Sequence, residues 1–116
     1  MKKTKMLKKN YEFRQVLTKG EYYTGNYIKA FVKKNNSQNN FLGLAISTKA
    51  GKANKRNRMK RLLRENYKNL EYSLKNGYSI VFLIKKDVNI DEIKFENIEK
   101  DMYKILKKAE IIVLDQ

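Results

Sequence analysis

The chain has 116 residues, a formal net charge of +15 and 41% hydrophobic residues. This length predicts a single domain over residues 1–116, and the hydrophobic content is sufficient for a packed core, which argues against a disordered chain. The sequence contains no cysteine and no histidine. Disulfides, thiolate metal sites and Cys- or His-based catalysis are therefore excluded, and any catalysis by the protein itself would have to use carboxylates, Lys, Tyr or hydroxyls.

The excess positive charge lies in the first part of the chain. Residues 1–68 hold 19 Lys and Arg against 3 Asp and Glu, whereas residues 69–116 hold 8 against 9. Such a concentration of like charge favours a polyanionic partner, either nucleic acid or an anionic membrane surface. The longest apolar run, Ile80–Ile84, is far shorter than the roughly 20 residues that span a bilayer, and no signal-peptide pattern precedes it. We therefore expect a cytoplasmic protein without a membrane partner.

A short helix is predicted near the N-terminus. Asn10 is a suitable N-cap and Gly20 a suitable stop. Between them, the apolar residues Phe13, Val16 and Leu17 follow at i, i+3 and i+4, so one side of this helix is apolar.

Two strands are predicted next, over residues 27–33 and 41–47, where apolar side chains alternate along the chain. Because an Asn-rich loop separates them, we interpret the pair as a β-hairpin. The segment Tyr22-Tyr23 is too short for its periodicity to decide whether it forms a further strand.

The second half of the chain has a similar mixture of elements. A helix is predicted over about residues 53–74, closed by Gly77, and a last helix over about residues 95–112. Between them, residues 78–84 are apolar on both faces, which is typical of an interior strand. This order indicates an α+β sandwich in which helices cover one sheet.

The segment of residues 49–68 is the densest cationic feature, with nine basic residues that include four of the five arginines. Arginine offers a planar fork of donors that matches phosphate oxygens, which lysine does not. Opposite the apolar arc of the predicted helix lie Asn57, Arg61, Arg64 and Lys68, which we call the basic ridge. A merely solvated helix face is the alternative, but Glu65 is the only acid in this segment to pair with these charges.

A second candidate surface is one face of the strand at residues 27–33. Its members are Tyr27, Lys29, Phe31 and Lys33. Alternating aromatic and basic side chains on an open sheet face can stack unpaired bases and neutralise phosphates. Alternatively, the rings pack beneath a neighbouring helix with the lysine stems at its edges, and the residues alone do not decide between these interpretations.

The acidic residues near the last helix form a third candidate group, which consists of Asp87, Asp91, Glu92, Glu96 and Glu99. Carboxylates of this kind can hold a catalytic metal ion. Their spacing is more typical of helix N-terminal charge and a solvent-exposed face, so we do not expect a metal site here.

The run Lys52–Glu65, KANKRNRMKRLLRE, resembles the Arg-Asn-Arg motif of the bacterial ribonuclease P protein subunit family. Two flanking signals agree with this resemblance: Leu7–Asn10 followed by Phe13, and Gly43–Ser47 followed by Lys49 and Gly51. The similarity covers about residues 5–110.

This resemblance implies a two-layer α-β-β-β-α-β-α sandwich, like domain 2 of ribosomal protein S5, with a left-handed crossover at the motif helix. It also implies a single RNA-binding domain whose partners are a catalytic RNA and precursor tRNA. In this family, the RNA and its bound magnesium remove the 5′ leader from precursor tRNA, so the protein acts as a subunit of an endoribonuclease without supplying catalytic groups. No small-molecule cofactor is expected.

The resemblance also assigns residues to surfaces. The predicted RNA-binding set is Lys52, Arg56, Asn57, Arg58, Lys60, Arg61, Arg64 and Lys68. A cleft between the first helix and the sheet is expected to hold the single-stranded leader, which favours the RNA-facing interpretation of the strand face. The predicted leader-binding set is Phe13, Leu17, Tyr27, Lys29, Phe31, Lys33 and Lys49. Leu17 stands where some members have Phe, and Thr48 where Lys is common.

The leading hypothesis is therefore a ribonuclease P protein subunit that acts in tRNA 5′ maturation. A non-catalytic RNA-binding module, such as a small ribosomal protein, is the alternative, because a basic helix buried in ribosomal RNA has the same composition. A protein-only nuclease is a third and more distant interpretation, since the chain lacks the commonest general base.

Overall fold

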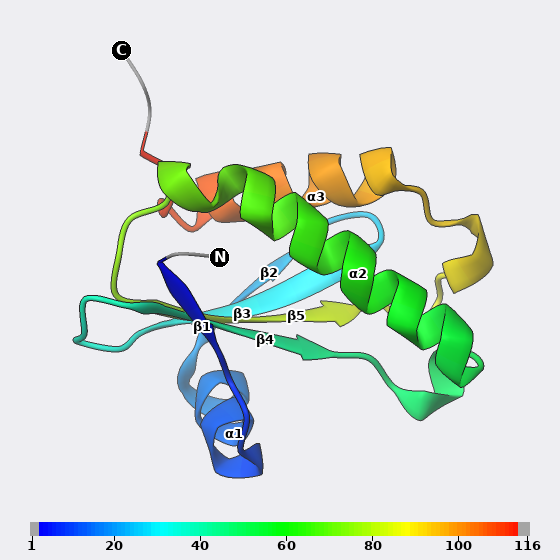
Figure 1. Ribbon diagram of the computed structural model, residues 1–116, viewed down its shortest axis with the longest axis horizontal. Helices are drawn as coiled ribbons and strands as arrows, with labels where there is room; N and C mark the ends of the chain where they lie inside the picture. Colours follow the sequence, from blue (N-terminus) through cyan, green and yellow to red (C-terminus); the bar gives the residue numbers. More distant parts are fainter. Residues whose placement is uncertain (1–2, 114–116) are drawn as a thin grey trace.

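The computed structural model describes residues 3–113 (Figure 1). Its helices and strands are β1 (Thr4–Met6), α1 (Asn10–Lys19), β2 (Glu21–Thr24), β3 (Ile28–Lys34), β4 (Asn40–Ala45), α2 (Ala53–Leu70), β5 (Tyr78–Ile84) and α3 (Phe95–Lys108). Three short 3-10 turns are η1 (Thr48–Ala50), η2 (Glu71–Ser73) and η3 (Ile90–Glu92). The predicted α+β class is confirmed, and none of these helices is long and apolar enough to cross a membrane.

The five strands form one mixed sheet in the order β1-β4-β5-β3-β2. The central strand β5 pairs in parallel with β4 and antiparallel with β3. The sequence predicted β5 as an interior strand, and this is confirmed: α2 and α3 cover one face of the sheet and α1 crosses the other (Figure 1). A strand covered on both faces must be apolar on both faces.

The predicted hairpin between residues 27–33 and 41–47 is wrong. Both strands form, but β5 lies between them, so β3 and β4 do not pair. The sequential hairpin of this region is β2–β3, which decides the open question at Tyr22-Tyr23 in favour of a strand. Alternation along one segment predicts a strand, but it does not say which other strand is its partner.

The crossover from β4 through α2 to β5 joins neighbouring parallel strands. Its hand is left: α2 lies above the sheet and β4 lies in front of β5, while both strands run in the same direction (Figure 1). About 98% of such connections are right-handed, so this topology agrees with the resemblance and with few other folds. The expected two layers are the sheet and the α2–α3 layer, to which α1 adds a partial third layer.

Both long helices end earlier than their periodicity predicts. The helix expected to run to residue 74 ends at Leu70, and the one expected to run to residue 112 ends at Lys108. The reason is tertiary, because Leu74 and Ile112 form an isolated antiparallel bridge with each other. The three-residue strand β1, which pairs with β4, was not predicted because it is too short to show a period.

The first helix begins and ends where the sequence indicated, but its cap differs. Lys9 occupies the N-cap position, so the assignment of Asn10 as N-cap is wrong by one residue. The carboxylate of Glu12 accepts hydrogen bonds from the backbone N–H groups of Lys9 (2.9 Å) and Lys8 (3.1 Å). These two bonds lower the pKa of Glu12 below its usual value. The helix ends at Gly20, as predicted.

A buried carboxylate on α3 holds the turn between β2 and β3. Asp101 is 3% exposed, and it accepts hydrogen bonds from the backbone N–H groups of Asn26, Tyr27 and Ile28 at 3.0, 2.6 and 3.0 Å. A side chain at Gly25 would collide with this carboxylate, since a Cβ there would lie 2.5 Å from its carbon. The contact fixes where β3 begins, and therefore which of its side chains face α1.

Replacing Asp101 with Asn should destabilise the fold. The amide nitrogen of Asn cannot accept a hydrogen bond, so a buried N–H group loses its partner, at a cost of about 1–3 kcal/mol. Urea unfolding measures the loss, with Glu99→Gln on the exposed side of α3 as the matched control. Equal free energies of unfolding for the two variants would contradict the anchoring role.

Candidate nucleic-acid interface

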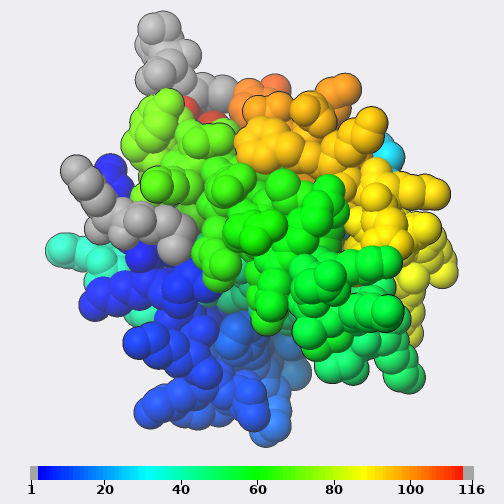
Figure 2. All heavy atoms as spheres, turned by 45° about the vertical axis from the view of Figure 1, so that its right-hand side comes forward, coloured from blue at the N-terminus to red at the C-terminus, as the bar shows by residue number. Residues whose placement is uncertain are grey.

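The basic ridge lies on the solvent-facing side of α2. Figure 2 shows α2, in green, across the front surface of the molecule, with α1 and the N-terminal residues, in blue, below it. The opposite side of α2 is anchored by Met59, Leu63 and Tyr67, each 0% exposed. All ridge residues, Asn57, Arg61, Arg64 and Lys68, are exposed. The sequence therefore predicted both faces of this helix correctly.

The ridge arginines are available to a ligand. Within residues 3–113, the guanidinium groups of Arg61 and Arg64 make no hydrogen bond or ion pair. Each therefore keeps its full fork of donors for phosphate oxygens. Their separation of three residues places the two groups about one turn apart on the same face of α2.

The arginines near the start of α2 have protein partners instead. Arg58 donates to the backbone carbonyls of Ile93 (2.7 Å) and Ile90 (3.4 Å), which ties α2 to the η3 segment. Arg56 donates to the carbonyl of Gly51 at 2.6 Å. Both side chains are half-buried. The predicted RNA-binding set thus contains both exposed arginines on the ridge and arginines, such as Arg58, that are hydrogen-bonded to the protein's own backbone.

The remaining members of that set lie at the edges of α2. Lys52 is exposed at the N-cap position, and Lys60 is half-buried. One of the acidic residues considered for a metal site, Asp91, forms an ion pair of 2.8 Å with Lys55 of α2. This pairing fits the solvent-face interpretation of the acidic group.

On the other face of the sheet, the strand register places side chains in three rows. These rows are Ala45–Leu83–Lys29, then Gly43–Val81–Phe31, then Phe41–Ser79–Lys33. Helix α1 lies over the middle row, because Val16 and Val81 are buried in one cluster with Phe13 and Phe31 packed against them. At Gly43, a Cβ would come within 2.6 Å of the Phe13 ring. Helix α1 therefore divides this face into two sides.

The helical positions of α1 assign side chains to the two sides. With Val16 directed at the sheet, Phe13 and Leu17 flank it on one side, whereas Glu12 and Gln15 flank it on the other. On the first side lies the row that begins with Ala45. We call this side the Leu17 surface, and it consists of Phe13, Leu17, Lys29, Ala45 and Leu83.

The predicted aromatic and basic strand face is divided by this arrangement. Phe31 is half-buried beneath α1, with its ring tilted at 52° against Tyr22 and 5.2 Å from it. Lys29 and Lys33 lie on opposite sides of α1. Tyr27 does not belong to this face: it precedes β3 and packs against the core beneath α2 and α3. Its inclusion was wrong because the strand alternation begins only at the next residue.

Three lysines lie beyond the ends of β4 and β5, the strands that supply Ala45 and Leu83. These parallel strands end side by side, so Lys49, Lys85 and Lys86 line one pocket of about 390 Å³. Lys49 and Lys86 are exposed, and Lys85 donates to the carbonyl of Gly25 at 3.2 Å. Lys85 and Lys86 were not predicted, because the sequence indicated no strand partner for β5 and so did not place its end beside that of β4. Recognition of the parallel pair would have placed them beside Lys49.

The fold and these surfaces define a small α+β nucleic-acid-binding protein with cationic groups on both sides of its sheet. Comparison with known proteins is more specific. The family model described as Ribonuclease P matches residues 1–110, and the chain belongs to this family. It is accordingly the protein component of a ribonucleoprotein endoribonuclease of tRNA processing, and it needs an RNA partner.

Similar proteins cover nearly the whole chain. A ribonuclease P protein component of Clostridium botulinum (strain Loch Maree / Type A3) is 39% identical over 112 residues, which cover 96% of this chain and 98% of that protein. The ribonuclease P protein component of Fusobacterium nucleatum is also 39% identical, over 91% of this chain and 97% of that protein. The Staphylococcus aureus RNase P protein structure superposes with a TM-score of 0.81 at 25% identity, over 92% of this chain and 96% of that chain.

The different situations of Arg58 and Arg61 lead to different expected effects on stability. Arg58→Lys should lower the free energy of unfolding by about 1–3 kcal/mol, because one ammonium group cannot replace a guanidinium that bridges two carbonyls. Arg61→Lys, on the exposed ridge, is the matched control and should leave it unchanged. Urea unfolding of both variants measures this difference. An Arg58→Lys protein with an unchanged free energy of unfolding would show that Arg58 does not secure η3.

Proposed function

We propose that the chain binds the catalytic RNA of ribonuclease P through the basic ridge and the 5′ leader of precursor tRNA through the Leu17 surface. The observation that carries the first part is the pair of guanidinium groups, Arg61 and Arg64, that have no partner within residues 3–113 and stand on a helix whose opposite side is fully buried. Family membership supplies the kind of RNA partner.

In this proposal the RNA carries the chemistry. The charged residues of both surfaces are lysines and arginines, and such cationic groups repel Mg²⁺ while they attract phosphate. These residues do not fit a protein-held magnesium ion, so we assign magnesium mainly to the RNA partner. The protein contributes one RNA-binding domain that reduces phosphate repulsion between two RNAs, and it supplies no acid, base or nucleophile.

The Leu17 surface suits a single-stranded leader. Phe13 offers a half-buried ring beside the apolar Leu17, so a base gains one aromatic contact and one aliphatic contact. Lys29 lies in the adjoining row, and the lysine pocket at Lys49 and Lys86 continues beyond the strand ends. Bases are thus contacted near α1 while the phosphates pass along the lysines.

Replacing both ridge arginines should weaken assembly with the catalytic RNA. We expect Arg61→Ala with Arg64→Ala to lower affinity about 10- to 100-fold, equivalent to about 1.4–2.8 kcal/mol. The slope of log affinity against log salt should fall by about one for each phosphate that is no longer neutralised. Filter binding over a salt series measures both quantities.

The control for the ridge is a second pair of exposed cations, Lys100→Ala with Lys104→Ala on α3, which removes the same charge elsewhere. Equal losses of affinity for the two double variants would show that the ridge contributes only its charge and no specific contact with the RNA. Cleavage of precursor tRNA by the chain with and without the cognate RNA tests the family function itself. Cleavage by the RNA-free protein would contradict the assigned division of labour.

Lys29 should distinguish precursor from mature tRNA. Lys29→Ala should weaken binding of precursor tRNA to the holoenzyme about three- to tenfold, which corresponds to roughly 1 kcal/mol for the ion pair with one phosphate. Mature tRNA lacks a leader, so its affinity should not change. Lys34→Ala, on the same strand but the opposite sheet face, is the control. Equal losses for both tRNAs would exclude the Leu17 surface as the leader site.

A further inference from the structure

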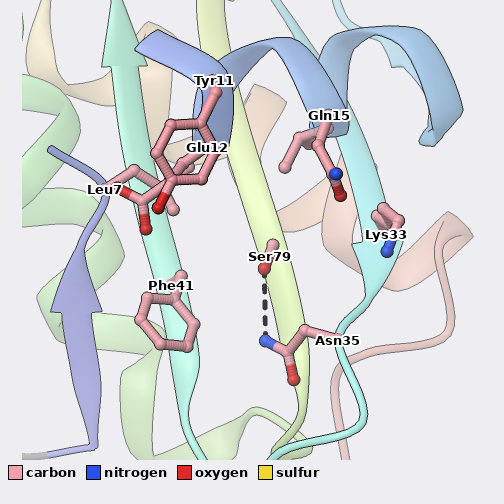
Figure 3. Close-up of a pocket in the computed structure, with 9 residues that line it drawn as sticks. Leu7, Tyr11, Glu12, Gln15, Lys33, Asn35, Phe41 and Ser79 are labelled. Carbon is pink, nitrogen blue, oxygen red and sulfur yellow. Dashed lines mark hydrogen bonds between the residues drawn. The ribbon is translucent and has the colours of Figure 1, made fainter. Parts of the chain in front are cut away.

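A groove lies on the side of α1 opposite the Leu17 surface (Figure 3). It encloses about 270 Å³ between α1 and the row Phe41–Ser79–Lys33. Figure 3 shows the rings of Tyr11 and Phe41 along one side and the side chains of Gln15 and Lys33 on the other, with Ser79 and Asn35 between them. We call it the Tyr11 groove.

The aromatic side of the groove is accessible. Tyr11 is 59% exposed although its ring is a large apolar surface, and Phe41 is half-buried at the edge of the smaller core cluster. The ammonium group of Lys9 lies 5.8 Å from the centre of the Tyr11 ring. An exposed aromatic ring with a cation beside it is a combination on which nucleic-acid bases stack.

The floor of the groove offers fixed polar groups. The side-chain N–H₂ group of Asn35 donates to Ser79 Oγ at 3.2 Å and to the carbonyl of Asn39 at 3.1 Å, while its Oδ1 accepts from Ser37. Asn35 is therefore held in one orientation. Within residues 3–113, the hydroxyl of Ser79 accepts this bond and donates none, so its own hydrogen is available to a ligand.

The charged groups of the groove favour an anion near Lys33. Among the described residues 3–113, the ammonium group of Lys33 donates to one backbone carbonyl, that of Lys34, at 3.2 Å, so it keeps further N–H donors for a ligand. The carboxylate of Glu12 also lines the groove, but it is held at the start of α1 by the backbone N–H groups of Lys8 and Lys9. These bonds direct its charge toward the helix N-terminus and away from Lys33, which lies across the groove (Figure 3).

We propose that the Tyr11 groove binds one unpaired nucleotide of an RNA. The base stacks on Tyr11 and Phe41, Ser79 and the side-chain amide of Gln15 hydrogen-bond its edge, and Lys33 contacts its phosphate. The volume agrees with a ligand of this size, because pockets for larger, drug-sized molecules enclose about 300–1,000 Å³. The inference rests on the proposed function only for the RNA that supplies the nucleotide, either the leader or the catalytic RNA.

Titration of the full chain with pentauridylate, followed by the NMR shifts of its backbone amides, tests the groove directly. The amides of Gln15 and Asn35 report on the Tyr11 groove, and those of Leu17 and Ala45 on the Leu17 surface. Tyr11→Ala should weaken binding at the groove amides about 5- to 150-fold, the ratio expected when one base stack is removed. The response at the Leu17 surface should remain.

Two further variants separate the possible outcomes. Tyr11→Phe keeps the ring and should bind as the unchanged chain does, which excludes misfolding as the cause of a loss. Lys29→Ala should weaken the response at the Leu17 surface alone. If the groove amides respond and the Leu17 surface does not, the proposed leader site fails and the groove stands. If the groove amides do not shift, or shift equally in Tyr11→Ala, the inference is overturned.

Assays of the reconstituted holoenzyme that carries Tyr11→Ala show which RNA supplies the nucleotide, the leader or the catalytic RNA. Weaker binding of precursors with long leaders, but not short ones, identifies the leader. Weaker assembly with the catalytic RNA, independent of leader length, identifies that RNA. If neither precursor binding nor assembly with the catalytic RNA changes, the groove binds no nucleotide in the holoenzyme and the inference is overturned.

Discussion

The central strand β5 constrains the rest of the structure, because both of its faces must be kept from water. Ile80 and Phe82 face α2 and α3, and Val81 faces α1. Covering Val81 requires α1 to cross the sheet, whereas covering Phe82 requires the apolar side of α2 to face inward and its basic ridge to face outward. The positions of both candidate RNA surfaces therefore follow from the burial of one apolar strand.

The same burial explains how the fold tolerates its net charge of +15. Like-charged neighbours on a helix cost only a few tenths of a kcal/mol per pair. On the other side of α2, Met59, Leu63 and Tyr67 are completely buried, and each such side chain contributes about 1.5–3 kcal/mol. The hydrophobic contribution exceeds the repulsion, so exposed arginines can be kept without acidic partners until an RNA neutralises them.

The sequence predicted the local features of the structure but missed those that depend on long-range contacts. The two faces of α2 were predicted because a helix repeats every 3.6 residues, and β5 because an interior strand is apolar throughout. The hairpin, the face of Tyr27 and the lysines Lys85 and Lys86 were missed for one common reason. Each depends on strand partners or a tertiary anchor, here the parallel β4–β5 pair and the buried Asp101, and local alternation contains no information about either.

The spacing of Lys29 and Lys33 shows how such tertiary information changes a functional interpretation. Both point to the same face of β3, and their four-residue separation spans about 13 Å of strand. This is close to the diameter of a helix with its side chains, about 10–12 Å, so α1 fits between them over Phe31 and Val81. A pattern that looks like one continuous aromatic and basic face is thereby divided into two candidate RNA-binding surfaces, each with one lysine of β3 and its own apolar contacts from α1.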